Sequence, residues 1–258
     1  MKIFDSHAHI YDKCFTSDFT EMLENAYNAD VHAIMIVGTD ISSSKKAVNI
    51  AKSYKNLFAS IGFHPHDAKN CSDKNIKILK KLAENSCVKA WGEIGLDFNR
   101  MFSSVVIQEK WFEKQIQAAK ELDLPVIFHE RDSKGRFLEI LNLYKNEKIK
   151  GVIHCFSGSG NELLKYLDMG YFIGITGILT LKQRGQSLRE LVKMIPDKKI
   201  LIETDAPYLA PSPYKNKTRR NEPAFVRSVL IKLSQIKKQE PEKLGKIIWN
   251  NTCSLFNI

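Results

Sequence analysis

The segment Ile3-Phe4-Asp5-Ser6-His7-Ala8-His9-Ile10 is the first of a series of apolar runs that decide the fold. Its apolar character predicts a β-strand, in which successive side chains alternate between the two faces. Asp5, His7 and His9 are therefore expected on one side of the strand, where two imidazoles one repeat apart can bind a metal ion together. The pair alone is weak evidence because His-x-His is a common spacing. It gains weight because four later runs also end in His, Glu or Asp.

Each apolar run is followed by a periodic stretch typical of an amphipathic helix. Eight strand-then-helix units in 258 residues predict an α/β protein, a TIM (β/α)8 barrel formed by a single domain spanning residues 1–258. An open doubly wound sheet is the alternative, but its first strand would lead into a glycine-rich nucleotide loop, and this chain has none there. The predicted strands are Ile3–Ile10, Ala33–Gly38, Leu57–Phe63, Val88–Ile94, Pro125–His129, Gly151–Cys155, Tyr171–Ile175 and Ile200–Thr204.

The composition narrows the class of protein. Lys and Arg number 39 against 29 Asp and Glu, and the net charge of +10 would attract a polyanion or simply keep a lysine-rich surface soluble. The five cysteines are scattered and form no C-x-x-C pair, which argues against a disulfide framework or a structural zinc cluster. No apolar run is long enough for a transmembrane helix, and the N-terminus lacks the apolar core of a signal peptide, so we expect a cytoplasmic protein without a membrane anchor.

Polar side chains gather where the predicted strands end, which in a TIM barrel is the face that carries the active site. Burying one unpaired polar group costs roughly 2–7 kcal/mol, whereas a whole domain is stable by only about 5–15 kcal/mol. Divalent cations would offset that cost by binding the imidazole nitrogens and neutralising the carboxylates. The residues at these strand ends are His7, His9, His64, Glu93, His129, His154 and Asp205.

The sequence around these residues resembles the TatD-type metal-dependent deoxyribonucleases, which belong to the amidohydrolase-like superfamily. The resemblance extends from residue 3 to about residue 255 and implies a TIM barrel with a two-metal centre. The segments that carry it are Asp5–His9, Gly62–His66, Gly92–Asp97, Ile153–Ser159, Glu203–Pro211 and Arg220–Ala224.

The resemblance also implies a ligand set. His7, His9 and Asp205 would hold one metal ion, His129 and His154 would hold the other, and Glu93 would bridge them. Histidine ligands suit Zn²⁺ and carboxylates suit Mg²⁺ or Mn²⁺, so the metal stays open. The chain departs from the usual pattern at Glu130 and in a basic loop, residues 214–220, and neither change removes a proposed ligand.

Two carboxylates are the candidate catalytic groups. Asp205 could orient or deprotonate the attacking water, or serve only as a metal ligand, and Glu93 would act by holding both ions.

Five side chains are candidates for binding substrate. His64 could touch a phosphate or hydrogen-bond within its loop. Arg131 could bind a phosphate or pair with a neighbouring carboxylate. Lys217, Arg219 and Arg220 could follow a nucleic-acid backbone or belong to a solvated loop.

The leading hypothesis is a DNA phosphodiesterase, a 3′-5′ exonuclease on single strands or ends, with a monomer favoured. The alternative is an amidohydrolase, but those enzymes usually bridge their metals with a carbamylated lysine at the end of the fourth strand, where this chain has Glu93. An aminoacyl-ester hydrolase would use the same ligands and stays open.

Overall fold

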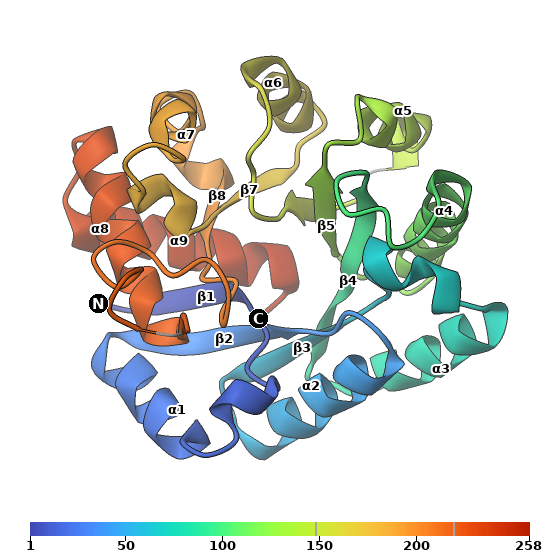
Figure 1. The fold of residues 1–258 in the computed structure, drawn as a ribbon, viewed down its shortest axis with the longest axis horizontal. Coiled ribbons are helices and arrows are strands. Elements are labelled where there is room, and N and C mark those ends of the chain that lie inside the picture. The colour runs from blue at the N-terminus through green and yellow to red at the C-terminus, as the bar shows by residue number, and fades with distance from the viewer. Residues whose placement is uncertain (148, 219) are drawn as a thin grey trace.

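Eight parallel strands pair in the order β1 to β8 and curl into a nearly closed barrel in the computed structural model, which describes residues 1–147, 149–218 and 220–258 (Figure 1). A parallel bridge between Ala8 and Ala206 joins β1 to the segment after β8. The predicted TIM barrel is therefore confirmed. The strands are β1 (Ile3–Ala8), β2 (Val31–Val37), β3 (Leu57–Ile61), β4 (Val88–Asp97), β5 (Val126–Arg131), β6 (Gly151–Ile153), β7 (Phe172–Ile175) and β8 (Ile200–Ile202).

Helices alternate with the strands and surround the barrel (Figure 1). Two begin with a capping box, in which Asp40 pairs with Ser43 at α2 and Ser159 pairs with Glu162 at α6. None of the described helices is both long and apolar enough to cross a bilayer. The helices are α1 (Phe19–Asn28), α2 (Ile41–Ser53), α3 (Asp73–Ala83), α4 (Val105–Glu121), α5 (Arg136–Leu143), α6 (Gly160–Asp168), α7 (Gln186–Leu191), α8 (Val226–Lys237) and α9 (Pro241–Phe256).

Two apolar clusters hold the barrel together. The larger one joins the strands to the surrounding helices. The smaller one consists of inward-facing strand residues and reaches Leu255 and Phe256 at the end of α9, so that this helix closes the end of the barrel where Phe4 of β1 lies. The strand residues of this inner cluster are Phe4, Ala33, Met35, Val37, Ala90, Ile127, Val152 and Leu201. The opposite end of the barrel is left for polar groups.

The strand β4 continues to Asp97, beyond its predicted end at Ile94. Gly95 makes this possible because its φ of +153° lies outside the range of ordinary side chains, and a Cβ there would lie 1.8 Å from the carbonyl oxygen of His129. The close approach lets β4 pair with β5 in register as far as Arg131. Asp97 is consequently held in the strand and not in the following loop.

Candidate metal centre

A cavity of about 920 Å³ opens at the C-terminal ends of the strands. Its walls include side chains that follow β1, β3, β6 and β8, together with side chains within β4 and β5. Because parallel strands all present their C-terminal ends at the same mouth, residues far apart in the chain meet there. His9, His64, Glu93, His129, His154 and Asp205 line this cavity, and His7 lies buried beneath them.

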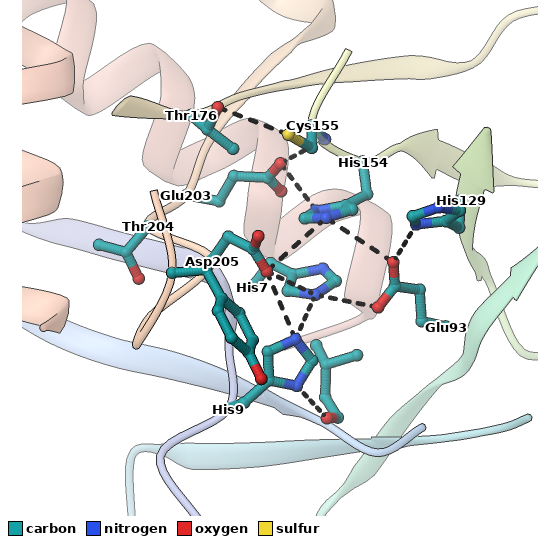
Figure 2. A network of polar contacts seen from close by, with 12 residues as sticks. His7, His9, Glu93, His129, His154, Cys155, Thr176, Glu203, Thr204 and Asp205 are labelled. Carbon is teal, nitrogen blue, oxygen red and sulfur yellow. Dashed lines mark hydrogen bonds and ion pairs between the residues drawn. The ribbon is translucent and has the colours of Figure 1, made fainter. Parts of the chain in front are cut away.

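His7 and His9 approach Asp205 and Glu93 at one side of the centre (Figure 2). The Nε2 atoms of the two imidazoles are 3.3 Å apart. Oδ1 of Asp205 lies 3.4 Å from His9 Nε2 and 3.7 Å from His7 Nε2. Oε2 of Glu93 lies 3.4 Å from His7 Nε2. On its other side the His9 ring is fixed by Nδ1, which donates to the carbonyl oxygen of Val37 at 2.8 Å.

His154 joins the same side of the centre. Its ring stacks on that of His7, with the centroids 3.5 Å apart, and its Nε2 lies 3.8 Å from Asp205 Oδ1. Nδ1 faces the other way, 2.9 Å from Oε1 of the buried Glu203. Glu203 also accepts a hydrogen bond from the backbone N–H of Cys155 at 2.6 Å. The carboxylate thus turns Nε2 of His154 toward the cavity.

His129 and His64 meet the second oxygen of Glu93. His129 Nδ1 lies 2.6 Å from Glu93 Oε1, and His64 Nε2 lies 3.7 Å from the same oxygen. The two imidazoles approach each other at 3.2 Å. Oδ2 of Asp97 lies 3.2 Å from His129 Nε2 and 2.8 Å from Nε2 of His66, so Asp97 orients both rings.

The ligand pairing that the resemblance implies stays a prediction, because His154 lies near both groups of donor atoms. The donor atoms that lie close enough together to share an ion form the groups His7–His154–Asp205, His7–His9–Glu93 and His64–Glu93–His129. Nε2 of His154 lies 3.8 Å from Asp205 Oδ1 and 3.7 Å from Glu93 Oε1, the oxygen that His129 also contacts. His64 is buried among these atoms. Its Nδ1 accepts a hydrogen bond from the backbone N–H of His66 at 3.1 Å, which is the loop hydrogen bond that the sequence suggested as one of two roles.

The carboxylates and imidazoles shift one another's pKa values. Burial disfavours the charged form of His154, but the carboxylates of Glu203 and Glu93 outweigh it and raise its pKa to about 10. Burial likewise opposes the charge on His129, while Asp97 and Glu93 raise its pKa to about 9. For Glu93 burial favours the neutral acid, and the surrounding histidines hold its pKa well below the usual range. The ionised carboxylates thus favour positive charge at the centre, carried by protons on these imidazoles or by a bound cation that replaces the protons.

The donor set fits a divalent cation. Atoms bound to one such ion at about 2.0–2.2 Å stand roughly 3–3.6 Å from each other. Nε2 of His7 lies 3.3 Å from Nε2 of His9 and 3.4 Å from Oε2 of Glu93. Nε2 of His9 lies 3.4 Å from Oδ1 of Asp205. Neutral imidazole and carboxylate are ligands for Zn²⁺, Mn²⁺ and related ions. The geometry of these residues is thus already close to that of a coordination shell.

Comparison with known proteins decides the family. The family model of TatD-related DNases matches residues 4–257. The chain belongs to the TatD-related DNase family. A protein of Citrobacter rodentium named 3′-5′ ssDNA/RNA exonuclease TatD is 38% identical, with 99% of this chain and 98% of the relative covered. An uncharacterized metal-dependent hydrolase of Bacillus subtilis, YabD, is 34% identical over 99% of both chains. The crystal structure of the TatD homologue YJJV from Escherichia coli superposes with a TM-score of 0.90 at 28% identity, covering 99% of this chain and 98% of that one.

The predicted substrate residues of this TatD-related DNase take different positions. Arg131 is exposed and lines the cavity. The guanidinium of Arg220 donates a hydrogen bond to Asp18 at 2.9 Å and lies 4.5 Å from the ring centroid of Phe15. It is therefore already paired within the protein. Lys217 is exposed and does not line the cavity. Arg219 lies outside the described residues.

Three further basic side chains line the mouth and were not predicted. Lys46, Arg100 and Arg184 are exposed there, and within residues 1–147, 149–218 and 220–258 none of them forms an ion pair. Lys46 belongs to α2, and the two arginines belong to loops after β4 and β7. Sequence position could have suggested the arginines because both follow predicted strands. Lys46 carries no such signal, since one helical lysine among many gives no sign of facing the mouth.

Proposed function

We propose that this TatD-related DNase is a metal-dependent exonuclease that removes nucleotides from the 3′ end of single-stranded DNA. The observation that carries the proposal is the convergence of buried histidines and carboxylates in one open cavity. Family membership supports nucleic acid as the substrate. The relatives named 3′-5′ ssDNA/RNA exonuclease, which include a protein of Klebsiella pneumoniae at 39% identity, support the polarity and the single-stranded form.

The geometry supports two divalent ions, Mg²⁺, Mn²⁺ or Zn²⁺, with Glu93 between them. Its Oε2 faces His7 while its Oε1 faces His129 and His154 (Figure 2), and His64 lies 3.7 Å from the same Oε1. His9 and Asp205 complete the group around His7, and His154 lies between the two groups, 3.8 Å from Asp205 Oδ1 and 3.7 Å from Glu93 Oε1. When bound, such a pair of ions supplies an acidified water and neutralises charge on the phosphoryl oxygens.

Asp205 is positioned to orient the attacking water and take its proton. Its contacts with His7, His9 and His154 all involve Oδ1, and Oδ2 takes part in none of these three. Burial would raise the pKa of Asp205, but the hydrogen bond from His9 and the neighbouring imidazoles hold it below the ordinary value. The carboxylate form is thus available to accept a proton at neutral pH.

Basic side chains at the mouth are positioned to receive the phosphodiester. Arg131, Lys46, Arg100 and Arg184 surround the cavity without ion-pair partners in the described part of the chain. An arginine can hold two phosphate oxygens at once, which fixes the strand while leaving base identity unread.

The amidohydrolase alternative receives no support from this geometry. Those enzymes usually place a lysine beside the buried ligands, and the lysine that lines the cavity among the described residues is the exposed Lys46. Glu93 instead contacts His7 through one carboxylate oxygen and His129 through the other.

The test is a metal-reconstitution assay that compares the native chain with Glu93→Ala. Protein stripped with a chelator is assayed with Mg²⁺, Mn²⁺ or Zn²⁺ on end-labelled single-stranded oligonucleotides and, in parallel, on a cyclic amide. We expect one of the ions to restore stepwise removal of 3′ nucleotides by the native chain. Loss of Glu93 should lower kcat/KM by at least about 100-fold, since even residues that only support metal ligands are worth 10–100-fold.

The matched control is Glu121→Ala, which removes an exposed carboxylate of α4 that pairs with Lys80. It should keep full activity. Hydrolysis of the cyclic amide but not of DNA, or unchanged nuclease activity in Glu93→Ala, would refute the proposed function.

A further inference from the structure

Two large aromatic side chains at the cavity remain mostly uncovered. Phe102 is 54% exposed and Tyr208 is 56% exposed, and both line the cavity. Single exposed apolar residues are common on protein surfaces and need no explanation. Here the two belong to the same cavity, whose other lining residues apart from Leu209 are charged or polar, so their shared position calls for a common role.

The two rings stand on opposite sides of the mouth. Phe102 lies in the loop between β4 and α4, and Tyr208 lies in the loop between β8 and α8. In the strand order β1 to β8 these two strands are four places apart, which in an eight-stranded barrel is the full width of the mouth. The donor groups around Glu93 therefore lie between the two aromatic rings.

Each ring contacts a histidine at one end of the metal centre. The Phe102 ring lies 5.0 Å from that of His66, at 84°, and His66 contacts Asp97, which orients His129. The Tyr208 ring lies 6.0 Å from that of His9, at 66°. These contacts anchor one edge of each aromatic side chain and leave more than half of its surface available to a ligand.

We propose that Phe102 and Tyr208 are stacking surfaces for the two bases that flank the scissile phosphate. The inference rests on the proposed function and extends it to the form of nucleic acid that the site accepts. Every base has a π-face, so stacking holds a strand without reading its sequence. Two successive bases can lie on rings at opposite sides of the mouth only if they are unstacked from each other and unpaired. The two rings thus select single strands and exclude duplex ends.

The experiment combines variants with oligonucleotides that lack one base. Wild type, Phe102→Ala and Tyr208→Ala are compared on single strands that are intact, abasic at the 3′-terminal nucleotide, or abasic at the one before it. Loss of one stacked base is worth roughly 5- to 150-fold. We expect each alanine variant to lose about that factor in kcat/KM on the intact strand. On the strand that lacks the base held by the missing ring, the alanine variant and wild type should have the same kcat/KM.

Two further variants separate stacking from structural damage. Phe102→Trp keeps an aromatic face and should recover most of the kcat/KM that Phe102→Ala loses on the intact strand. Tyr27→Ala is the matched control, since Tyr27 is a 65% exposed tyrosine that packs at 5.0 Å against His32 and does not line the cavity. It should behave as wild type. If Phe102→Ala and Tyr208→Ala lower kcat/KM by the same factor on intact and abasic strands, the stacking proposal is overturned.

Binding provides a readout that does not need turnover. Fluorescence anisotropy measures Kd for each combination of variant and labelled oligonucleotide, intact or abasic. If wild type hydrolyses none of the strands, the proposed function fails, and the anisotropy cycle still decides the stacking proposal. If the alanine variants lose activity on intact strands and lose none on the matching abasic strands, the result supports both the proposed function and the stacking proposal.

Discussion

At the scale of single residues, Glu203 shows how a side chain outside the cavity can control the metal centre. It is 1% exposed, and its carboxylate contacts Nδ1 of His154 and the backbone N–H of Cys155. A histidine that uses one nitrogen for such a contact presents the other nitrogen in a fixed direction and tautomer. Glu203 is therefore a positioning residue, whose effect passes through His154.

Replacing Glu203 with Gln should lower metal affinity by about 10- to 100-fold, because the amide holds the His154 ring less firmly. kcat measured at saturating metal should stay close to that of wild type, since Glu203 does not reach the substrate. Titration of chelator-stripped protein with Mn²⁺, followed by activity and by calorimetry, measures both quantities. Glu190→Gln, which changes an exposed carboxylate paired with Lys193, serves as the control. Unchanged metal affinity in Glu203→Gln would contradict the positioning role.

At the scale of elements, the strands could be predicted from the sequence because their apolar runs are long and separated by helical periodicity. The end of β4 could not, since Gly95 resembles a strand breaker until its approach to β5 is known. The convergence of His7, Glu93 and the other strand-end residues followed from parallel topology alone. Which imidazole faces which oxygen of Glu93 depends on side-chain packing, and no sequence pattern encodes it.

Loop residues were harder to assign because charge alone does not reveal a partner. No sequence pattern indicates that Arg220 pairs with Asp18, which lies 202 positions earlier in the chain. The same lack of local pattern hid Lys46 at the mouth. Prediction therefore succeeded where strand geometry fixes a side chain and failed where a distant residue decides its contacts.

Asp197 lies three residues before β8 and contacts α8, α9 and the segment between them, and these contacts predict a pH dependence. Its carboxylate lies 3.0 Å from Nζ of Lys237 in α8 and accepts a hydrogen bond at 2.6 Å from Gln239, while its carbonyl oxygen accepts one from Asn251 of α9. Burial would raise the pKa of Asp197, but the hydrogen bonds from Gln239 and Lys237 outweigh it and lower the pKa. Because the folded-state pKa lies below the unfolded value of about 3.9, the stabilisation is complete above that pH and is lost as the pH falls through the folded-state pKa.

Asp197→Asn should accordingly reduce the free energy of unfolding at pH 7 by about 1 kcal/mol, a value discounted for the partial exposure of the pair. The difference from wild type should shrink as the pH falls below about 4. Urea denaturation at a series of pH values measures it. Asp168→Asn, which breaks an exposed pair with Lys145, should change stability by less than about 0.5 kcal/mol. A difference that stays constant with pH would contradict the ionic contribution of Asp197.

At the scale of the whole molecule, the candidate ligands link segments that are distant in the chain. They come from or directly follow β1, β3, β4, β5, β6 and β8, so the donor groups assemble only when most of the barrel is formed. A metal ion that binds this assembled centre binds the folded chain and has little affinity for the unfolded one. Metal binding and global stability must then be coupled.

This coupling predicts that a divalent ion raises the melting temperature of the whole barrel. At a free metal concentration about 100 times Kd, the stabilisation is about 2.7 kcal/mol. For a chain of this length that corresponds to roughly 5–10 °C. Differential scanning calorimetry of chelator-stripped protein, with and without the ion that restores activity, measures the shift. In Glu93→Ala, which loses the residue between the two donor groups, most of the shift should disappear, whereas Glu121→Ala should keep it. Equal shifts in both variants would mean that the ion stabilises the protein from some other position, and the metal centre would have to be reassigned.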